Sequence, residues 1–177
     1  IYTYGGKGYD QGNCVRHTSD GGFALLGSSG SFGNGNADVY LIKTDSAGVY
    51  EWSKTYGGTQ TDCGFKMEQT QDNGYIITGY TNSFNALDYD VYLLRTDSLG
   101  DTLWTKTYGS TGWDIGHSVK QLNDGGFIIA GETSGTSNMT GTDVYLIRTD
   151  SMGDTLWTRS YGGNHDDIGK SVALTHD

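Results

Sequence analysis

The stretch that decides the fold is Asp143–Gly163, "DVYLIRTDSMGDTLWTRSYGG". Two further copies precede it, "DVYLLRTDSLGDTLWTKTYGS" at Asp90–Ser110 and "DVYLIKTDSAGVYEWSKTYGG" at Asp38–Gly58. The rest of the chain follows the same period, because a tyrosine that opens a Y-G-G or Y-G-S motif recurs every 52 or 53 residues, at Tyr4, Tyr56, Tyr108 and Tyr161. Self-similarity at a fixed period over the whole length indicates a repeat architecture.

Each repeat divides into four short runs that are typical of β-strands. In the third copy the runs are "GHSVKQL", "FIIAGET", "DVYLIRT" and "DTLWTRSYG". They are rich in Val, Ile, Phe, Tyr and Thr, they are bounded by D-G-G and D-S-x-G turns, and no window carries a helical period with caps. The D-S-x-G turns suit a type I turn followed by a left-handed glycine, which makes a bulged hairpin. The sequence therefore predicts an all-β chain of four-stranded antiparallel sheets.

The second and third strands are apolar on both faces, as "FIIA" and "VYLI" show, so each sheet is expected to be covered on both sides. A unit of this kind, stacked between copies of itself, is the blade of a β-propeller. The first strand, rich in small residues, is expected innermost and the fourth at the outer edge. The predicted parts are the end of a preceding blade at 1–6, full blades at 7–58, 59–110 and 111–163, and the first strand of a next blade at 164–177.

Three blades and two fragments do not close a ring, since propellers close with about four to eight blades. The chain also begins at Ile1, without a signal-peptide pattern. We therefore expect a piece of a longer chain, whose partners are other blades of that chain or neighbouring subunits. An open array, or an assembly of several chains, is the alternative.

The fourth strand of each repeat carries a stripe of alternate residues that share one face. The stripes are Trp52–Lys54–Tyr56, Trp104–Lys106–Tyr108 and Trp157–Arg159–Tyr161. One interpretation is packing between blades, with the charged side chain protecting an edge strand. The other is a cation stacked between two aromatic rings.

Composition limits the classes of partner. A net charge of −10 over 177 residues argues against nucleic acid and against an anionic membrane surface. No apolar run approaches the roughly 20 residues that a membrane span needs. The two cysteines, Cys14 and Cys63, take different positions in their repeats, so one disulfide between them is possible and the redox compartment stays open.

The sequence offers no catalytic constellation. The four histidines stand at unmatched positions in their repeats, and no G-x-S-x-G motif occurs. We therefore expect a protein that is not an enzyme and that has no required cofactor.

One set of aspartates recurs before the first strand of each repeat. Its members are Asp10, Asp62, Asp114 and Asp167. In a closed ring these carboxylates would converge near one mouth of the channel, where they could hold Ca²⁺ together with backbone carbonyls. The alternative is that each aspartate caps its own turn through backbone N–H groups two residues on.

The segments between the second and third strands vary, whereas the scaffold positions barely change. They are "SSGSFGNGNA" at 28–37, "TNSFNALDY" at 81–89 and "TSGTSNMTGT" at 133–142. Such loops are where a rigid scaffold displays recognition residues. The candidates for contact with a protein or a carbohydrate are Asn82, Phe84, Asn85, Tyr89 and the non-repeated Trp113. Drift without function is the alternative.

The pattern D-x-G-x-S-V, D-G-G-[FY]-I-I-[AT]-G and D-V-Y-L-[IL]-[KR]-T-D-S-x-G-D-T-L-W-T-[KR]-T-Y-G-[GS] resembles the β-propeller repeat family of bacterial and archaeal secreted proteins. The likeness is greatest to large surface proteins of Bacteroidetes-like organisms, which often end in a type IX secretion sorting domain. The resemblance covers essentially the whole chain, although a complete member would also have a signal, a sorting domain and more blades. It implies an extracellular or cell-surface location and no particular ligand.

These observations together predict a non-catalytic extracellular scaffold for binding or adhesion, to a protein or a carbohydrate, within a larger surface protein. Two alternatives remain: a structural repeat unit of a surface layer or fibre, and the non-catalytic part of a propeller enzyme.

Overall fold

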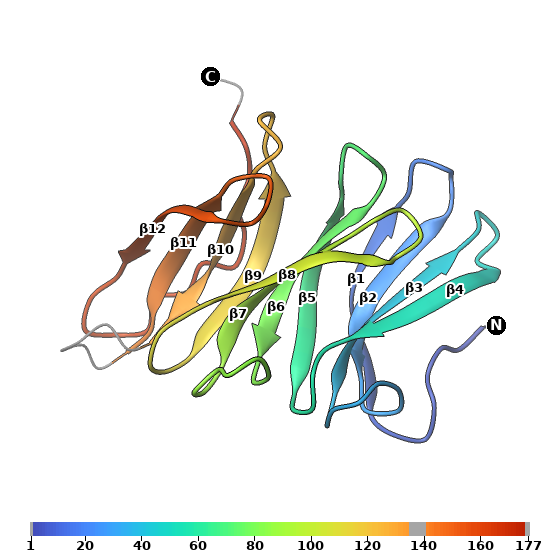
Figure 1. Ribbon diagram of the computed structural model, residues 1–177, viewed down its shortest axis with the longest axis horizontal. Helices are drawn as coiled ribbons and strands as arrows, with labels where there is room; N and C mark the ends of the chain where they lie inside the picture. The colour runs from blue at the N-terminus through green and yellow to red at the C-terminus, as the bar shows by residue number, and fades with distance from the viewer. Residues whose placement is uncertain (1, 135–140, 176–177) are drawn as a thin grey trace.

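The computed structural model describes residues 2–134 and 141–175, and within them the chain is all β with no helix (Figure 1). The strands are β1 (Asp10–His17), β2 (Phe23–Ser29), β3 (Asp38–Thr44), β4 (Tyr50–Tyr56), β5 (Asp62–Gln69), β6 (Tyr75–Thr81), β7 (Asp90–Thr96), β8 (Thr102–Tyr108), β9 (Asp114–Gln121), β10 (Phe127–Thr133), β11 (Asp143–Thr149) and β12 (Thr155–Tyr161). They form three four-stranded antiparallel sheets, β1 to β4, β5 to β8 and β9 to β12, each in chain order. The prediction of repeated four-stranded antiparallel sheets is confirmed.

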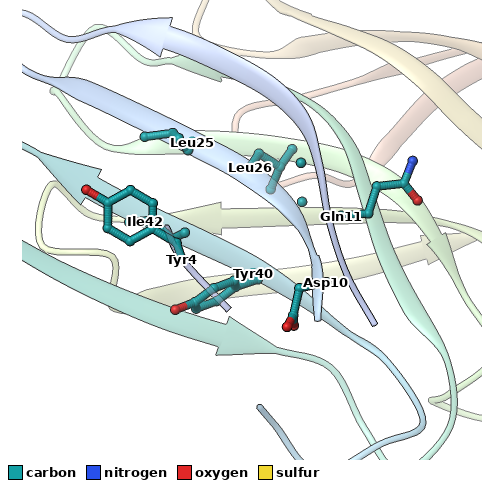
Figure 2. Close-up of a pocket in the computed structure, with 9 residues that line it drawn as sticks. Tyr4, Asp10, Gln11, Leu25, Leu26, Tyr40 and Ile42 are labelled. Atoms are coloured by element: carbon teal, nitrogen blue, oxygen red, sulfur yellow. The ribbon is translucent and has the colours of Figure 1, made fainter. Parts of the chain in front are cut away.

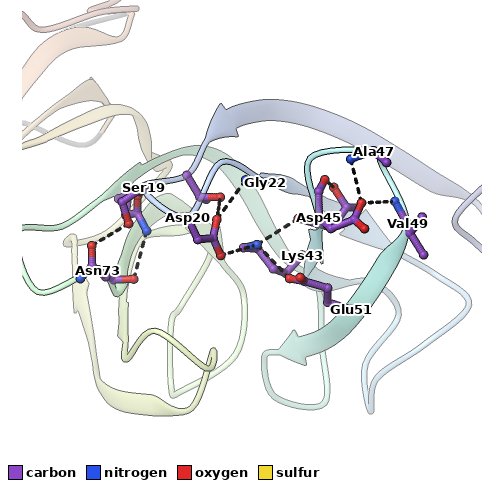
Figure 3. Close-up of polar contacts among 12 residues, drawn as sticks. Ser19, Asp20, Gly22, Lys43, Asp45, Ala47, Val49, Glu51 and Asn73 are labelled. Atoms are coloured by element: carbon purple, nitrogen blue, oxygen red, sulfur yellow. Dashed lines mark hydrogen bonds and ion pairs between the residues drawn. The ribbon is translucent and has the colours of Figure 1, made fainter.

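The D-S-x-G turns adopt the predicted bulged hairpin. Gly48, Gly100 and Gly153 have positive φ angles of 76°, 77° and 79°, and the strand register shifts directly before each turn. The turn aspartate holds the loop, since Asp45 Oδ1 accepts the N–H groups of Ala47 and Val49, each at 2.8 Å (Figure 3). Glycine is needed here because a left-handed conformation strains other residues.

A cation at the end of the third strand fastens the turn between the first two strands. Lys43 Nζ lies 2.8 Å from Asp20 Oδ2 and 2.9 Å from Glu51 Oε2, and it donates to the carbonyl of Thr44 (Figure 3). Arg95 and Arg148 repeat this role in the second and third sheets, where they pair with the turn aspartates. Each cation thus satisfies carbonyls that burial would otherwise leave unpaired.

The three sheets follow one another across the molecule and pack face to face (Figure 1). The core between the first and second sheets contains Ala24, Leu26, Val39, Leu41, Tyr56, Met67, Tyr75, Ile77, Tyr92 and Leu94. The core between the second and third sheets contains Ile76, Val91, Leu93, Tyr108, Val119, Phe127, Ile129 and Ile147. The middle sheet is therefore covered on both faces, as its unbroken apolar strands require.

The stripe on the fourth strand is the contact between sheets. The rings of Trp52 and Tyr75 pack edge to face, and Tyr56 donates its hydroxyl to the carbonyl of Gly100 at 2.7 Å. Lys54 pairs with the carboxylate of Asp101 in the next sheet. Packing between sheets is therefore the correct interpretation of the first stripe, and its cation meets a carboxylate rather than two rings.

The outer face of the first sheet has no neighbouring sheet within the described residues. Val15 is 55% exposed there, whereas Met67, which takes the same place in the second sheet, is fully buried. A hollow of about 140 Å³ lies on this face between Tyr4, Leu25, Tyr40 and Ile42 (Figure 2). Tyr4 covers part of it and donates its hydroxyl to Gly48 O at 2.9 Å, as Tyr56 does to Gly100.

The segment 164–175 lies against the third sheet. Gly169 N donates to Gly131 O at 3.1 Å, and Val172 N donates to Ser118 Oγ at 3.2 Å. A Cβ on Gly169 would stand 2.9 Å from Val144 Cγ1, as one on Gly116 would stand 3.0 Å from Val91 Cγ1. The segment therefore takes the place of the first strand of a following sheet, although none of its described residues form a β-strand.

Candidate functional site

The first strand of every sheet contains a β-bulge at the same place. In β1, β5 and β9 the register skips one residue, and the extra residue is Asn13, Phe65 or His117. Lys170 takes the corresponding position in the segment after the third sheet. An aspartate recurs three residues before the bulge and a glycine directly before it, but the bulge residue is different each time. Bulges re-aim a side chain, so this position presents variable chemistry at a sheet edge.

Successive bulge residues contact the neighbouring first strand. Asn13 Nδ2 donates to Gly64 O at 2.8 Å. The rings of Phe65 and His117 stack with their centroids 5.7 Å apart and their planes 9° from parallel. His117 Nε2 lies 2.8 Å from Glu132 Oε1 and 2.9 Å from Lys170 Nζ. The bulges therefore form one continuous line across the sheets.

Aromatic side chains extend this line to the loops at one end of the sheets. Phe65 meets Tyr80 at 5.5 Å between ring centroids, Tyr80 meets Tyr89 at 4.9 Å, and Tyr89 meets Trp113 at 5.8 Å, all edge to face. We call Phe65, Tyr80, Tyr89, Trp113 and His117 the aromatic row. Trp113 is 54% exposed and the other four are partly buried. The row thus offers ring surface to a ligand from a supported position.

The backbone holds the exposed end of the row. Tyr89 and Trp113 form a parallel bridge, and Asp114 N donates to Tyr89 O at 2.6 Å. Ser134 accepts the N–H of Trp113 on its hydroxyl at 2.7 Å and donates its own N–H to Trp113 O at 2.7 Å. Two rings from separate sheets are therefore fixed side by side without a ligand.

The sheets do not need the aromatic row in order to pack. At the preceding boundary, between the first and second sheets, four of the five corresponding positions hold small or polar residues, and Ala37 and Thr61 form the same parallel bridge as Tyr89 and Trp113. Those four are Asn13, Ser28, Ala37 and Thr61, and the fifth, which corresponds to His117, is Phe65 itself. The scaffold is equally complete there, so the aromatic row is a property added to the second and third repeats.

The five loop residues predicted from the sequence divide into two groups. Tyr89 and Trp113 are in the aromatic row. Phe84, by contrast, stacks on Tyr92 at 5.6 Å, as Phe32 packs on Tyr40 in the first repeat, so it has a repeated packing role. Asn85 occupies a left-handed turn position with φ 67°, and the backbone N–H of Asn82 donates to Thr61 O. Most of the 133–142 loop lies outside the described residues.

Sequence reasoning missed three members of the row, Phe65, Tyr80 and His117. All three lie within strands, where variation between repeats looks like ordinary tolerance. For Phe65 and His117, the signal that could have found them is the residue directly after the constant glycine of the first strand, which changes chemistry at every repeat.

The recurring aspartates are engaged in their own turns. Each accepts the backbone N–H of the residue four positions earlier, Gly6, Gly58, Ser110 or Gly163, at 2.7–3.1 Å. Hydroxyl groups add to this, since Ser83 Oγ donates to Asp62 Oδ2 at 2.8 Å. Asp10, Asp62, Asp114 and Asp167 therefore cap turns, as the alternative interpretation expected. The N–H group that each accepts belongs to the residue four positions earlier, however, and not to the residue two positions later.

Three of these capping aspartates, Asp62, Asp114 and Asp167, have a second aspartate nearby. A Cβ on Gly109 would overlap with Asp90 Oδ1 and stand 2.7 Å from Asp114 Oδ2, and Gly57 and Gly162 lie in the same way between two aspartates. Burial, with the neighbouring charge of Asp114, raises the pKa of Asp90. Burial also raises the pKa of Asp114. The glycine of the Y-G motif is thus required because two carboxylates enclose it.

Other features of the described residues bear on the predicted sites. Within residues 2–134 and 141–175, no three histidine, cysteine, aspartate or glutamate side chains gather as a metal site requires. Cys14 and Cys63 are free thiols. None of the described residues form a helix of the length and apolarity needed to cross a lipid bilayer.

The fold and the site define an all-β repeat protein with a non-repeated aromatic row at the edge of its sheets. No model of a known protein family matches the chain. The chain is similar to the regulatory protein FlaEY of Caulobacter vibrioides, with 30% identity over 164 residues that cover 79% of this chain and 17% of that protein. The likeness thus concerns a small part of FlaEY.

Proposed function

We propose that the chain is part of a β-propeller of the β-propeller repeat type and acts as a non-catalytic scaffold for binding at the cell surface. The radial arrangement is supported by which strands meet. The first strands of successive sheets are neighbours, β1 with β5 and β5 with β9, while no fourth strands lie in comparably close contact within the described residues. Contact between first strands, without comparable contact between fourth strands, is what a ring of blades would require, and it supports the proposal.

The observation that carries the binding function is the convergence of non-repeated residues into the aromatic row. Tyrosine and tryptophan supply large rigid contact areas at small entropic cost, and they dominate the energetics of many interfaces. In a propeller the row would follow the innermost strands and reach the rim at Trp113. This placement suits a protein or a carbohydrate that lies across the rim.

The location rests on the resemblance to secreted surface proteins. The net charge of −10 favours ligands other than nucleic acid and anionic membranes. A relative named as a regulatory protein is in keeping with a role exerted through binding.

The test is a ligand screen of the full chain against glycans and cell-surface proteins, followed by Trp113→Ala and Tyr89→Ala. We expect each variant to weaken binding roughly ten-fold or more, because the ring contacts are lost. The matched control is Tyr9→Ala, since Tyr9 is 78% exposed and occupies the position of Trp113 in the first repeat. Equal affinity of Trp113→Ala and the native chain, with the variant folded, would remove the row from the function.

A second candidate function is a structural unit of a surface layer or fibre. It is favoured by the uncovered sheet face at Val15 and the exposed stripe at Trp157. This role predicts association of the chain that rises with concentration, with no loss in Trp113→Ala. Light scattering of the two proteins separates it from the binding role.

A further inference from the structure

The third sheet exposes the stripe that the first two sheets bury. Tyr161 is 57% exposed and Trp157 is 39% exposed, whereas Tyr56 and Tyr108 are 7% and 9% exposed. Arg159 turns back on its own strand, where it donates to Thr158 O at 2.7 Å and its guanidinium lies 5.8 Å from the centre of the Trp157 ring. These residues form a surface that we call the end stripe.

The internal boundaries show what such a stripe meets. Trp104 packs edge to face on Phe127 at 5.8 Å, and Tyr108 donates its hydroxyl to Gly153 O at 2.6 Å. Lys106 Nζ lies 2.7 Å from Asp154 Oδ1. The stripe of the first sheet makes the same three kinds of contact with the second. The partner of a stripe is therefore the D-S-x-G-D turn and the second strand of the following sheet.

The cation of the stripe and the acid of the next turn change together. Lys54 and Lys106 each face an aspartate after the turn glycine. The first sheet has Val49 instead of an aspartate after its turn glycine. The stripe that would face Val49 ends at Tyr4, and its cation position holds Tyr2. Where the acid is absent, the cation is absent too. Arg159 is a cation, so its partner turn is expected to carry an acid.

The first sheet of a second copy fits the end stripe poorly. It would set Val49 opposite Arg159, and its Gly48 carbonyl already accepts the hydroxyl of Tyr4. The segment 164–175 also occupies the place of an incoming first strand, since Gly169 N donates to Gly131 O of the third sheet.

We propose that the end stripe docks a further four-stranded sheet of the same repeat, continuous with the segment 164–175, whose turn carries an acidic residue in the position of Asp101 and Asp154. This sheet pairs its acid with Arg159, accepts the hydroxyl of Tyr161 on its turn glycine and covers Trp157. The docking site is separate from the aromatic row, so it does not depend on the proposed binding function.

The test appends a copy of residues 73–110 after Asp177, so that Asp177 takes the place of Asp72. Four extended chains combine Arg159 or Arg159→Tyr with Asp or Val at the copied position of Asp101. We expect Trp157 to become protected from hydroxyl-radical oxidation in the Arg–Asp chain. The chains with matched pairs, Arg–Asp and Tyr–Val, should be more stable than the mismatched chains predict. The double-mutant cycle should give a coupling of roughly 1.5- to 5-fold in the unfolding equilibrium constant.

Two results would overturn the proposal. One is an extended set of chains in which Trp157 is as reactive as in the native chain and the four stabilities show no coupling. The other is protection of Trp157 by self-association of the native chain, which would make a second copy the occupant. If the extension fails to fold, Lys106→Tyr and Asp154→Val in the native chain test the pairing rule, and a cycle without coupling refutes it.

Discussion

The carboxylates of Asp90 and Asp114 both lie beside Gly109, and neither is paired with a cation in the described part of the chain. Asp90 Oδ1 is buried and accepts no hydrogen bond there, while Asp114 is 1% exposed. Burial and the charge of Asp114 raise the pKa of Asp90, so the folded state binds a proton there more tightly than the unfolded state. Asp90 therefore contributes stability at acidic pH, near and below its ordinary pKa of 3.8, and this contribution is lost as the pH rises through the raised pKa.

The variant Asp90→Asn removes this charge and keeps the shape of the side chain. We expect a melting temperature a few degrees above that of the native chain at pH 7, with the difference shrinking toward pH 4. Thermal unfolding between pH 4 and pH 8 measures it. Asp88→Asn, at an exposed neighbouring residue, is the control and should change stability by less than about 0.5 kcal/mol. A variant that is less stable than the native chain at pH 7 would show that the charge of Asp90 is needed.

At the scale of the strand, the tyrosine that ends each stripe fixes one sheet to the next. Tyr108 is buried and bonded to Gly153 O, whereas Tyr161 stands in the same place with no following sheet described and is 57% exposed. Tyr108→Phe would leave a buried carbonyl without its donor and should cost about 0.5–1.5 kcal/mol. Tyr161→Phe is the matched control and should be neutral. Urea unfolding of both variants checks this, and equal effects would contradict the role assigned to the stripe.

The strands and turns could be predicted because the same apolar runs and turn motifs recur in each repeat. The D-S-x-G turns need glycine at a positive φ, and the alternation of Trp, Lys and Tyr places three side chains on one face. The bulges could not be predicted in the same way. A strand such as β5 has eight residues, which is too short for one extra residue to show as a change in the alternation of side chains.

The candidate site was predicted only at its exposed end for a related reason. Trp113 and Tyr89 stand in loops, where an aromatic residue is conspicuous. Phe65, Tyr80 and His117 stand in strands that already contain many apolar residues, and only the contacts between sheets show that they join Trp113 in one row. Contacts between residues that are far apart in sequence are set by how the sheets pack, which no single repeat determines.

At the scale of the molecule, the same kind of interface between the stripe and a following sheet occurs at two boundaries, and at the third sheet the stripe is exposed. The first and second stripes are covered by the following sheet, and the end stripe is not. The four tryptophans report on this arrangement separately. Trp52 and Trp104 lie in the two internal boundaries, Trp157 lies on the end stripe, and Trp113 ends the aromatic row.

The most direct test of the account is hydroxyl-radical footprinting of the four tryptophans, in the isolated chain and in the protein purified from its source. In the isolated chain we expect Trp113 and Trp157 to be oxidised and Trp52 and Trp104 to be protected. In the purified protein Trp157 should become protected by a further sheet, while Trp113 stays reactive and available to a ligand. Trp52 as reactive as Trp157 in the isolated chain, or Trp113 protected in both samples without a ligand, would contradict the account.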